Sequence, residues 1–414
     1  MKVIVSIDQS TVATKGLVWS LGGHLLGRAD VSHRQITNPQ GWVEHDPMEI
    51  LYNSVKAVES ALEKAQADVK DIAVIGISNQ RETAVCWDRL TGMPVYNAIV
   101  WQCARATDIT QTVEESGWKE EVRKRTGLTL SPFFSAAKYG WIIKHIPEAA
   151  LAERRRNLCC GTVDSWLIFK LTGQFKTDYS NASRTQLMNL YDCKWDSELP
   201  EVFGLDTACL PEICMSDSLF GMTDLTGLLP KPVPVHGVMG DSHAALFGNQ
   251  CREQFTAKAT YGTGSSVMMN AGTVCPSPGD GVSASLAWGM NNKIEYVLEG
   301  NINYSGAVIK WLAEDIELLP DPKSAGGIAR TVPNTGGVYL VPAFSGLGAP
   351  YFISEARAAF VGMNRSTKKA HLIRAAEECI AYQIRDVVEA INGSISRPLS
   401  VLRVDGGGQR AMIF

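Results

Sequence analysis

The chain lacks the features that mark several common classes of protein. Lys and Arg total 39 against 43 Asp and Glu, for a net charge of −4, so there is no basic excess of the kind that holds nucleic acid. No apolar run approaches the ~20 residues of a membrane helix, and the apolar run at the start is too short for a signal peptide. We therefore expect a small-molecule partner, with no nucleic acid and no membrane.

Cysteine and histidine show none of the spacings that usually bind metal. The 10 cysteines include no C-x-x-C pair, and the 7 histidines include no H-x-x-x-H pair, which argues against a protein-held zinc. We interpret the cysteines as free thiols in a reducing cytoplasm, with a metal or redox site as the less favoured alternative. The expected localisation is cytoplasmic.

Length and hydrophobic pattern predict two α/β domains. Strands are expected over Val3–Ile7, Gly16–Ser20 and Leu25–Val31, with a hydroxyl-rich turn after the first of them. A similar order of strand, hydroxyl-rich turn and strand begins again near residue 257. We expect one domain over residues 1–250 and another over 251–414, with a ligand in a central cleft between them.

Two amphipathic helices are predicted from capping residues and apolar spacing. Asp46 can cap a helix that has Pro47 in its first turn, and Glu49 can complete a capping box. Apolar residues then recur with 3.6-residue spacing as far as Leu62. A second stripe runs from residue 373 to residue 391, and Gly393 is placed to end that helix.

Two turns carry the residue types that bind phosphate. Asp8 closes an apolar strand and is followed by Ser10, Thr11, Thr14 and Lys15, a mixture of hydroxyls and a cation that suits a nucleotide's phosphates, with the carboxylate on Mg²⁺. A polar hairpin turn after an edge strand is the structural alternative. The second turn, at residues 260–266, is rich in Gly, Thr and Ser. Two such turns, one in each half, are what a nucleotide bridging a cleft needs.

Three further residues are candidates for work on a substrate hydroxyl. Asp241 follows Gly240 at the end of a short apolar pair and is a candidate general base, while a helix N-cap is the structural alternative. Arg81 and Glu82 place a donor beside an acceptor, which can hold vicinal hydroxyls. For this pair the structural alternative is a surface ion pair.

These residues lie in longer stretches that resemble one known family. The stretches that match are 41–50, 79–83, 96–103, 177–185 and 341–351. Residues 133–142 fit the family's first signature, and residues 358–378 fit most of the second, with Glu377 where an apolar residue is usual. Over essentially its whole length the chain resembles a glycerol kinase-like member of the FGGY carbohydrate kinase family.

The resemblance implies a fold, a reaction and a set of site residues. The fold would be two ribonuclease-H-like domains of the actin and hexokinase superfamily with a central cleft. The reaction would be ATP- and Mg²⁺-dependent phosphorylation of a polyol or sugar hydroxyl, most simply glycerol to glycerol 3-phosphate. By position, Asp8 matches the metal-associated acid and Asp241 the catalytic base. The substrate positions are Arg81, Glu82, Trp101, Phe133, Asp241 and Ser242, and the nucleotide positions are Thr11, Thr14, Lys15, Thr263, Gly306, Lys310 and Gly407.

Several positions depart from the family pattern. Phe133 stands where glycerol kinases usually have Tyr, Ser242 where they have Gln and Ser266 where they have Phe, while Lys310 and Ala411 replace polar amides. The first phosphate turn also lacks its usual Gly. These changes leave two alternatives to a glycerol kinase. One is a kinase for a larger polyol or ketose, such as a tetritol or pentulose, and the other is a catalytically weak homologue that acts as a binding or regulatory protein.

The resemblance also bears on completeness and assembly. Family members continue beyond the Asp-Gly-Gly motif at Asp405, so the resemblance predicts a second domain that is C-terminally truncated. The family often forms dimers or tetramers, which leaves a homo-oligomer open.

Overall fold

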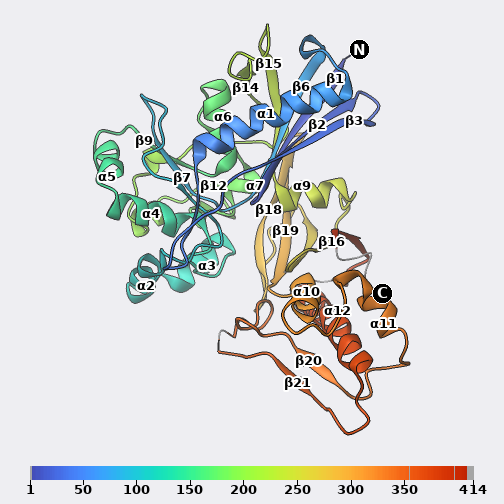
Figure 1. Cartoon of the computed structure of the whole chain (residues 1–414). Helices are drawn as coiled ribbons and strands as arrows, with labels where there is room; N and C mark the ends of the chain where they lie inside the picture. Colours follow the sequence, from blue (N-terminus) through green and yellow to red (C-terminus); the bar gives the residue numbers. More distant parts are fainter. Residues whose placement is uncertain (1, 354, 396, 408–414) are drawn as a thin grey trace. The chain divides into compact units, whose positions relative to one another are not determined.

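The computed structural model describes residues 2–353, 355–395 and 397–407. The chain forms two compact units, which interleave along the sequence (Figure 1). The first unit comprises residues 1–244 and 285–295, and the second comprises residues 245–284 and 296–414.

The first unit is built on a six-stranded mixed sheet. Its strands are β1 (Val3–Gln9), β2 (Ala13–Ser20), β3 (Leu25–Ser32), β6 (Ile72–Asn79), β14 (Leu219–Thr223) and β15 (Val233–Gly240). They are ordered β14–β15–β6–β1–β2–β3, and β15, β6 and β1 are parallel neighbours. Because β1 lies inside the sheet, the turn after it does not follow an edge strand.

The helix predicted behind Asp46 is α1 (Pro47–Ala65), which packs on β2 and β3. Asp46 is its N-cap and accepts the backbone N–H of Met48 at 2.8 Å. The predicted capping box is wrong, because the Glu49 carboxylate accepts the backbone N–H of Arg34 at 3.0 Å instead. A backbone N–H of the preceding loop therefore binds the Glu49 carboxylate, which the local sequence pattern predicts to bind the helix N-terminus.

A second helix of this unit, α6 (Val163–Thr172), contains a buried acid. Asp164 is fully buried and accepts the hydroxyls of Thr162 and Thr177. Burial, together with the nearby charge of Asp178, raises the pKa of Asp164 to about 7. The folded protein therefore holds a proton at Asp164 that the unfolded chain releases at much lower pH.

This difference predicts how stability depends on pH in the variant Asp164→Asn. Between pH 5 and pH 8 the folded protein must lose a proton at Asp164 that the unfolded chain has already lost, so rising pH destabilises the unchanged protein. The free energy of unfolding of the unchanged protein should fall by about 2–3 kcal/mol relative to that of Asp164→Asn over that interval. Urea unfolding of both proteins at pH 5 and pH 8 measures this difference, with the exposed Asp224→Asn as control. Parallel stability curves would contradict the burial argument.

The second unit repeats the strand pattern of the first. The five-stranded sheet contains β16 (Thr256–Tyr261), β17 (Ser265–Gly272), β18 (Ser283–Met290), β19 (Lys293–Ile302) and β22 (Val401–Asp405), in the order β18–β19–β17–β16–β22. Of these strands, β16, β17, β22 and most of β19 belong to the second unit, and most of β18 belongs to the first. β16 pairs antiparallel with β17 and parallel with β22, as β1 pairs with β2 and β6. The helices of this unit are α10 (Gly306–Glu314), α11 (Ala325–Ala329) and α12 (Lys369–Gly393). The repeat and the helix predicted from residue 373 are thus confirmed.

Smaller elements complete the units. In the first unit they are β4 (Ile36–Thr37), β5 (Val43–His45), β7 (Val85–Asp88), β8 (Ala98–Ile99), α2 (Thr107–Glu115), α3 (Lys119–Thr126), α4 (Ser135–His145), α5 (Pro147–Arg154), β9 (Leu158–Gly161), β10 (Lys176–Asp178), α7 (Tyr179–Ala182), β11 (Met188–Asn189), β12 (Lys194–Trp195), α8 (Leu199–Val202) and β13 (Glu212–Cys214). In the second they are β20 (Tyr339–Val341) and β21 (Ala359–Val361), and α9 (Asp241–Gly248) runs from one unit into the other.

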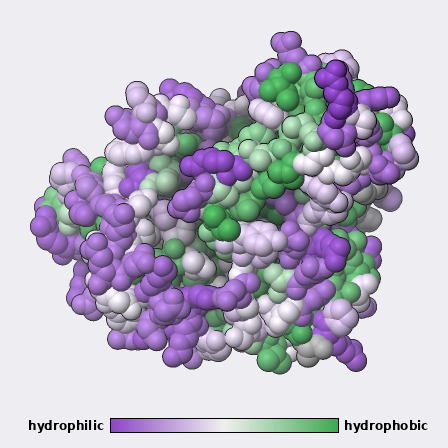
Figure 2. Space-filling model, turned by 90° about the horizontal axis from the view of Figure 1, so that it is seen from below, coloured by the Kyte–Doolittle hydropathy of each residue, from purple (hydrophilic) through white to green (hydrophobic). Residues whose placement is uncertain are grey.

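The surface is predominantly polar on the face that Figure 2 shows, where hydrophobic residues lie in smaller groups among hydrophilic ones. Apolar residues exposed in this way are usual on protein surfaces and indicate no particular partner. Over residues 2–353, 355–395 and 397–407, no helix has the length and apolar character needed to cross a membrane.

Candidate active site

Arg81 and Glu82 follow the end of β6 and are buried. Their side chains are 7% and 4% exposed, which excludes the alternative of a surface ion pair. The Arg81 Nε lies 4.0 Å from Glu82 Oε1. Glu82 has a φ of 60°, a left-handed conformation that costs a non-glycine residue about 1–3 kcal/mol. Strain of this kind is maintained only where the surrounding structure holds the residue in place.

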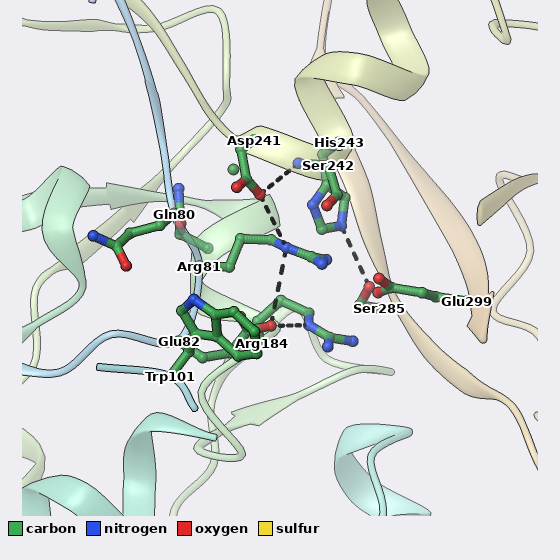
Figure 3. Close-up of polar contacts among 12 residues, drawn as sticks. Gln80, Arg81, Glu82, Trp101, Arg184, Asp241, Ser242, His243, Ser285 and Glu299 are labelled. Carbon is green, nitrogen blue, oxygen red and sulfur yellow. Dashed lines mark hydrogen bonds and ion pairs between the residues drawn. The ribbon is translucent and has the colours of Figure 1, made fainter. Parts of the chain in front are cut away.

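Asp241 lies beside Arg81 because β15 and β6 are parallel neighbours, with Gly240 paired to Asn79. The Arg81 Nε is 3.4 Å from Asp241 Oδ1. A Cβ at Gly240 would lie only 2.7 Å from Arg81 Cγ, so the glycine makes this approach possible. Figure 3 shows Arg81 between the carboxylates of Asp241 and Glu82. The carboxyl ends of such strands are where α/β proteins commonly bind ligands.

The environment of Asp241 suits a group that exchanges a proton. Removal from water raises its pKa above the ordinary value of an aspartate; the charge of Glu82 adds to this rise, and the charge of Arg81 opposes it. The side chain nevertheless retains 40% of its exposure, so a ligand can reach the carboxylate. Asp241 also begins α9 and accepts the backbone N–H of Ser242 at 2.6 Å. The two interpretations of Asp241, base and helix start, are therefore compatible.

Arg184 is a site residue that sequence reasoning missed. Its Nε donates to Glu82 Oε1 at 2.6 Å, and the Arg184 side chain is only 2% exposed (Figure 3). Residue 184 stands 102 positions from Glu82. In the stretch 177–185, Arg184 is the one charged residue after Asp178. That isolated charge is the sequence signal that could have identified it.

Trp101 and Phe133 form an aromatic corner. Their rings meet edge to face with centroids 5.5 Å apart. The Trp101 indole N–H donates to Thr11 Oγ1 at 3.0 Å, so this residue joins the predicted substrate position to the first phosphate turn. Behind Phe133, the fully buried ammonium of Lys138 donates to the backbone carbonyls of residues 132–134. Burial lowers the pKa of Lys138 to about 7.

The first phosphate turn brings Asp8 and Lys15 together. Lys15 Nζ lies 2.6 Å from Asp8 Oδ2, and both side chains are 30% exposed. Ser10 closes the turn by donating its hydroxyl to the carbonyl of Ala13 at 2.8 Å. Thr14 is not part of this group, because it alternates with Lys15 along β2 and is fully buried on the sheet face that α1 covers.

The second unit gathers three of its predicted residues. The backbone N–H of Gly306, at the start of α10, donates to the carbonyl of Gly262 at 2.9 Å, and that of Ala307 donates to Thr263 at 3.0 Å. A Cβ at Gly406 would lie 2.2 Å from the Tyr261 carbonyl, so the segment reaching Gly407 lies against the same turn. Thr263, Gly306 and Gly407 are therefore grouped around the end of β16.

Other predicted residues of this unit lie differently. Lys310 pairs with Glu314 at 3.5 Å on an exposed face of α10. The Ser266 hydroxyl donates to Glu299 at 3.2 Å. Ala411 lies outside the described residues.

Comparison with known proteins shows which protein family the chain matches. The N-terminal domain of the FGGY family of carbohydrate kinases matches residues 3–248, and the C-terminal domain of that family matches residues 257–414. Glycerol kinase 1 of Thermotoga maritima is 44% identical over 98% of this chain and 82% of the relative, and glycerol kinase 1 of Clostridium tetani is 43% identical with the same coverage.

Solved structures show the same fold. A crystal structure of Plasmodium falciparum glycerol kinase with ADP is 34% identical and superposes with a TM-score of 0.93, covering 99% of this chain and 83% of that one. Xylulose kinase from Lactobacillus acidophilus, at 21% identity, superposes with a TM-score of 0.87 over 99% of this chain and 82% of that one. The two-domain α/β fold that the resemblance implied is thereby confirmed, and the chain belongs to the FGGY family of carbohydrate kinases.

Proposed function

We propose that this chain transfers the γ-phosphoryl group of ATP to a hydroxyl of glycerol, giving glycerol 3-phosphate and ADP. The observation that carries the proposal is the group formed by Asp241, Arg81 and Glu82, in which Arg81 Nε lies 3.4 Å from Asp241 and Arg184 holds Glu82 at 2.6 Å. In this group Asp241 can accept a proton, Arg81 can donate to a substrate hydroxyl, and Glu82 can accept from another hydroxyl. Glycerol kinases among the relatives share 41–44% of its sequence.

In this mechanism Asp241 orients the attacking hydroxyl and accepts its proton. Phosphoryl transfer has a loose transition state, so the protein contributes mainly positioning and charge stabilisation. Arg81 donates to one substrate hydroxyl and Glu82 accepts from another, while Trp101 and Phe133 form an apolar wall beside the carbon chain. The oxygen of the substrate hydroxyl bonds to the transferred phosphorus, the bond to ADP breaks, and the proton ends on Asp241.

The residues around Asp8 fit a nucleotide with magnesium. Among the described residues, no group of three or more His, Cys, Asp and Glu could hold a metal ion. Mg²⁺ bound with a nucleotide needs no such cage, because one or two carboxylates suffice when phosphates and water supply the other ligands. Asp8 would provide that carboxylate, and Lys15 and Thr11 would face the phosphates. When bound, Mg²⁺ neutralises charge on the phosphates. Since the reaction consumes ATP, we infer a cytoplasmic location.

The choice of acceptor is tested by comparing polyols. We expect kcat/KM for glycerol to exceed that for a tetritol and a pentulose by at least 10-fold, because one methylene-sized misfit in a pocket typically changes kcat/KM by about 10–200-fold. ADP release in a coupled assay measures each value. A higher kcat/KM for the longer acceptors would instead support a kinase for a larger polyol or ketose. Absence of ADP release with every acceptor would support a binding protein.

A further inference from the structure

A buried polar cluster behind the site centres on Asp178, which the proposed mechanism does not use. Asp178 is fully buried and caps the short helix α7, accepting the backbone N–H groups of Ser180 and Asn181 at 3.0 Å each. The same carboxylate accepts the hydroxyls of Ser180, at 2.8 and 2.9 Å, and of Ser216, at 2.7 Å. Asn181 Nδ2 donates to it at 2.8 Å. Each partner is therefore held in one orientation by a buried charge.

Ser180 connects this cluster to Asp241. Its hydroxyl has a single proton, which it donates to Asp178, so the oxygen's lone pairs are left to accept. Ser180 Oγ accepts the backbone N–H of Gly240 at 2.8 Å. Gly240 immediately precedes Asp241 and is itself buried. The hydrogen bonds that link Asp178, Ser180 and Gly240 thus fix the backbone from which the Asp241 side chain projects.

The neighbouring residues of the same segment hold the other half of the site. Asn181 and Asn79 exchange two amide hydrogen bonds of 2.9 and 3.0 Å, and Asn79 is the last residue of β6, two positions before Arg81. Arg184, three residues further along, holds Glu82. In this segment the Ser180 side chain therefore contacts the backbone next to Asp241, whereas the side chains of Asn181 and Arg184 contact Asn79 and Glu82.

We propose that Ser180 is a positioning residue for the base, which uses the buried charge of Asp178 to hold Gly240 and so to set Asp241 against the substrate hydroxyl. The inference rests on the proposed function of Asp241. It adds that Ser180 positions the base, whereas Asn181 and Arg184 position the Arg81–Glu82 pair that binds the substrate hydroxyls. A misplacement of about 1 Å at a reacting group can lower a rate about 100-fold. Loss of the Ser180 hydroxyl should therefore affect kcat more than substrate binding.

Ser216 provides a matched control within the same cluster. Like Ser180, it donates its hydroxyl to Asp178, and it accepts one backbone N–H, that of Gly289, at 3.1 Å. Gly289 does not adjoin a proposed site residue. Ser216→Ala and Ser180→Ala each remove one hydroxyl that donates to Asp178 and accepts a backbone N–H. Only the Ser180 hydroxyl accepts the N–H of Gly240, the residue before Asp241.

The test measures kcat, KM for glycerol and thermal unfolding for the 414-residue chain and for Ser180→Ala, Ser180→Thr and Ser216→Ala. We expect Ser180→Ala to lower kcat at least 10-fold with KM within threefold of the unchanged value. Ser216→Ala should show a similar loss of thermal stability with kcat within threefold. Ser180→Thr, which retains the hydroxyl, should recover most of the kcat lost in Ser180→Ala.

Two results would overturn the positioning role. One is a kcat for Ser180→Ala within threefold of the unchanged chain, and the other is an equal fall in kcat for Ser180→Ala and Ser216→Ala. If the unchanged chain prefers another polyol, the same comparison is made with that acceptor, so a wrong substrate does not count against Ser180. Absence of turnover by the unchanged chain with every acceptor would overturn the proposed function and this inference together.

Discussion

Asp241→Asn is expected to lower kcat for glycerol phosphorylation about 100-fold or more, the usual contribution of a positioned general base. Asparagine has nearly the same shape and can still accept the backbone N–H that Ser242 donates at 2.6 Å. It cannot accept a proton from the attacking hydroxyl. KM for glycerol should change little, because Arg81 and Glu82 remain in place. Steady-state kinetics by coupled ADP release gives both values.

The pH dependence of the unchanged protein provides a second readout of the same group. Partial removal from water raises the pKa of Asp241, so its ionised form is lost at a higher pH than that of a free aspartate. On lowering the pH, kcat/KM should therefore fall through that raised pKa. The fall should be absent from the residual activity of Asp241→Asn. The exposed Asp224→Asn removes one carboxylate elsewhere in the same unit and should leave kcat unchanged. Near-normal turnover by Asp241→Asn would exclude Asp241 as the base.

The sequence predicted those parts of the molecule that depend on neighbours along the chain. The Asp46 cap, the apolar stripe of α1 and the strand at each phosphate turn are local patterns, and the structure has each of them. Asp241 and the Arg81–Glu82 pair were found because each follows an apolar strand. Their mutual approach then follows from the parallel pairing of β6 and β15.

What the sequence could not predict are contacts that only the tertiary fold creates. Thr14 and Lys15 are neighbouring polar residues, yet the alternation of β2 places only Lys15 beside Asp8. Spacing predicts a capping box with Glu49, but the Glu49 carboxylate accepts the backbone N–H of Arg34 in a loop instead. The buried cluster around Asp178 joins Asn79, Asp178 to Asn181, Ser216, Gly240 and Gly289. No local spacing encodes those pairings.

The second large effect is expected on stability, from Arg184→Met. Arg184 and Glu82 are 2% and 4% exposed and 2.6 Å apart, so removing the guanidinium leaves a buried carboxylate without its nearest cation. Breaking a buried ion pair in this way typically costs about 3–5 kcal/mol. Methionine retains most of the side-chain length, which limits the contribution of a cavity. Urea unfolding measures the loss, and KM for glycerol should rise because Glu82 is no longer held.

Arg28→Met is the matched control, because Arg28 pairs with Asp30 at a similar distance of 2.8 Å while the two side chains are 50% and 46% exposed. An exposed pair contributes only about 0–1 kcal/mol, so this variant should unfold almost as the unchanged protein does. Adding Glu82→Gln to Arg184→Met removes the buried negative charge that has lost its nearest cation, and should restore part of the stability without restoring KM. If Arg184→Met cost no more than Arg28→Met, the ion pair would not be what holds Glu82 in its left-handed conformation, and the adjoining backbone would have to do so instead.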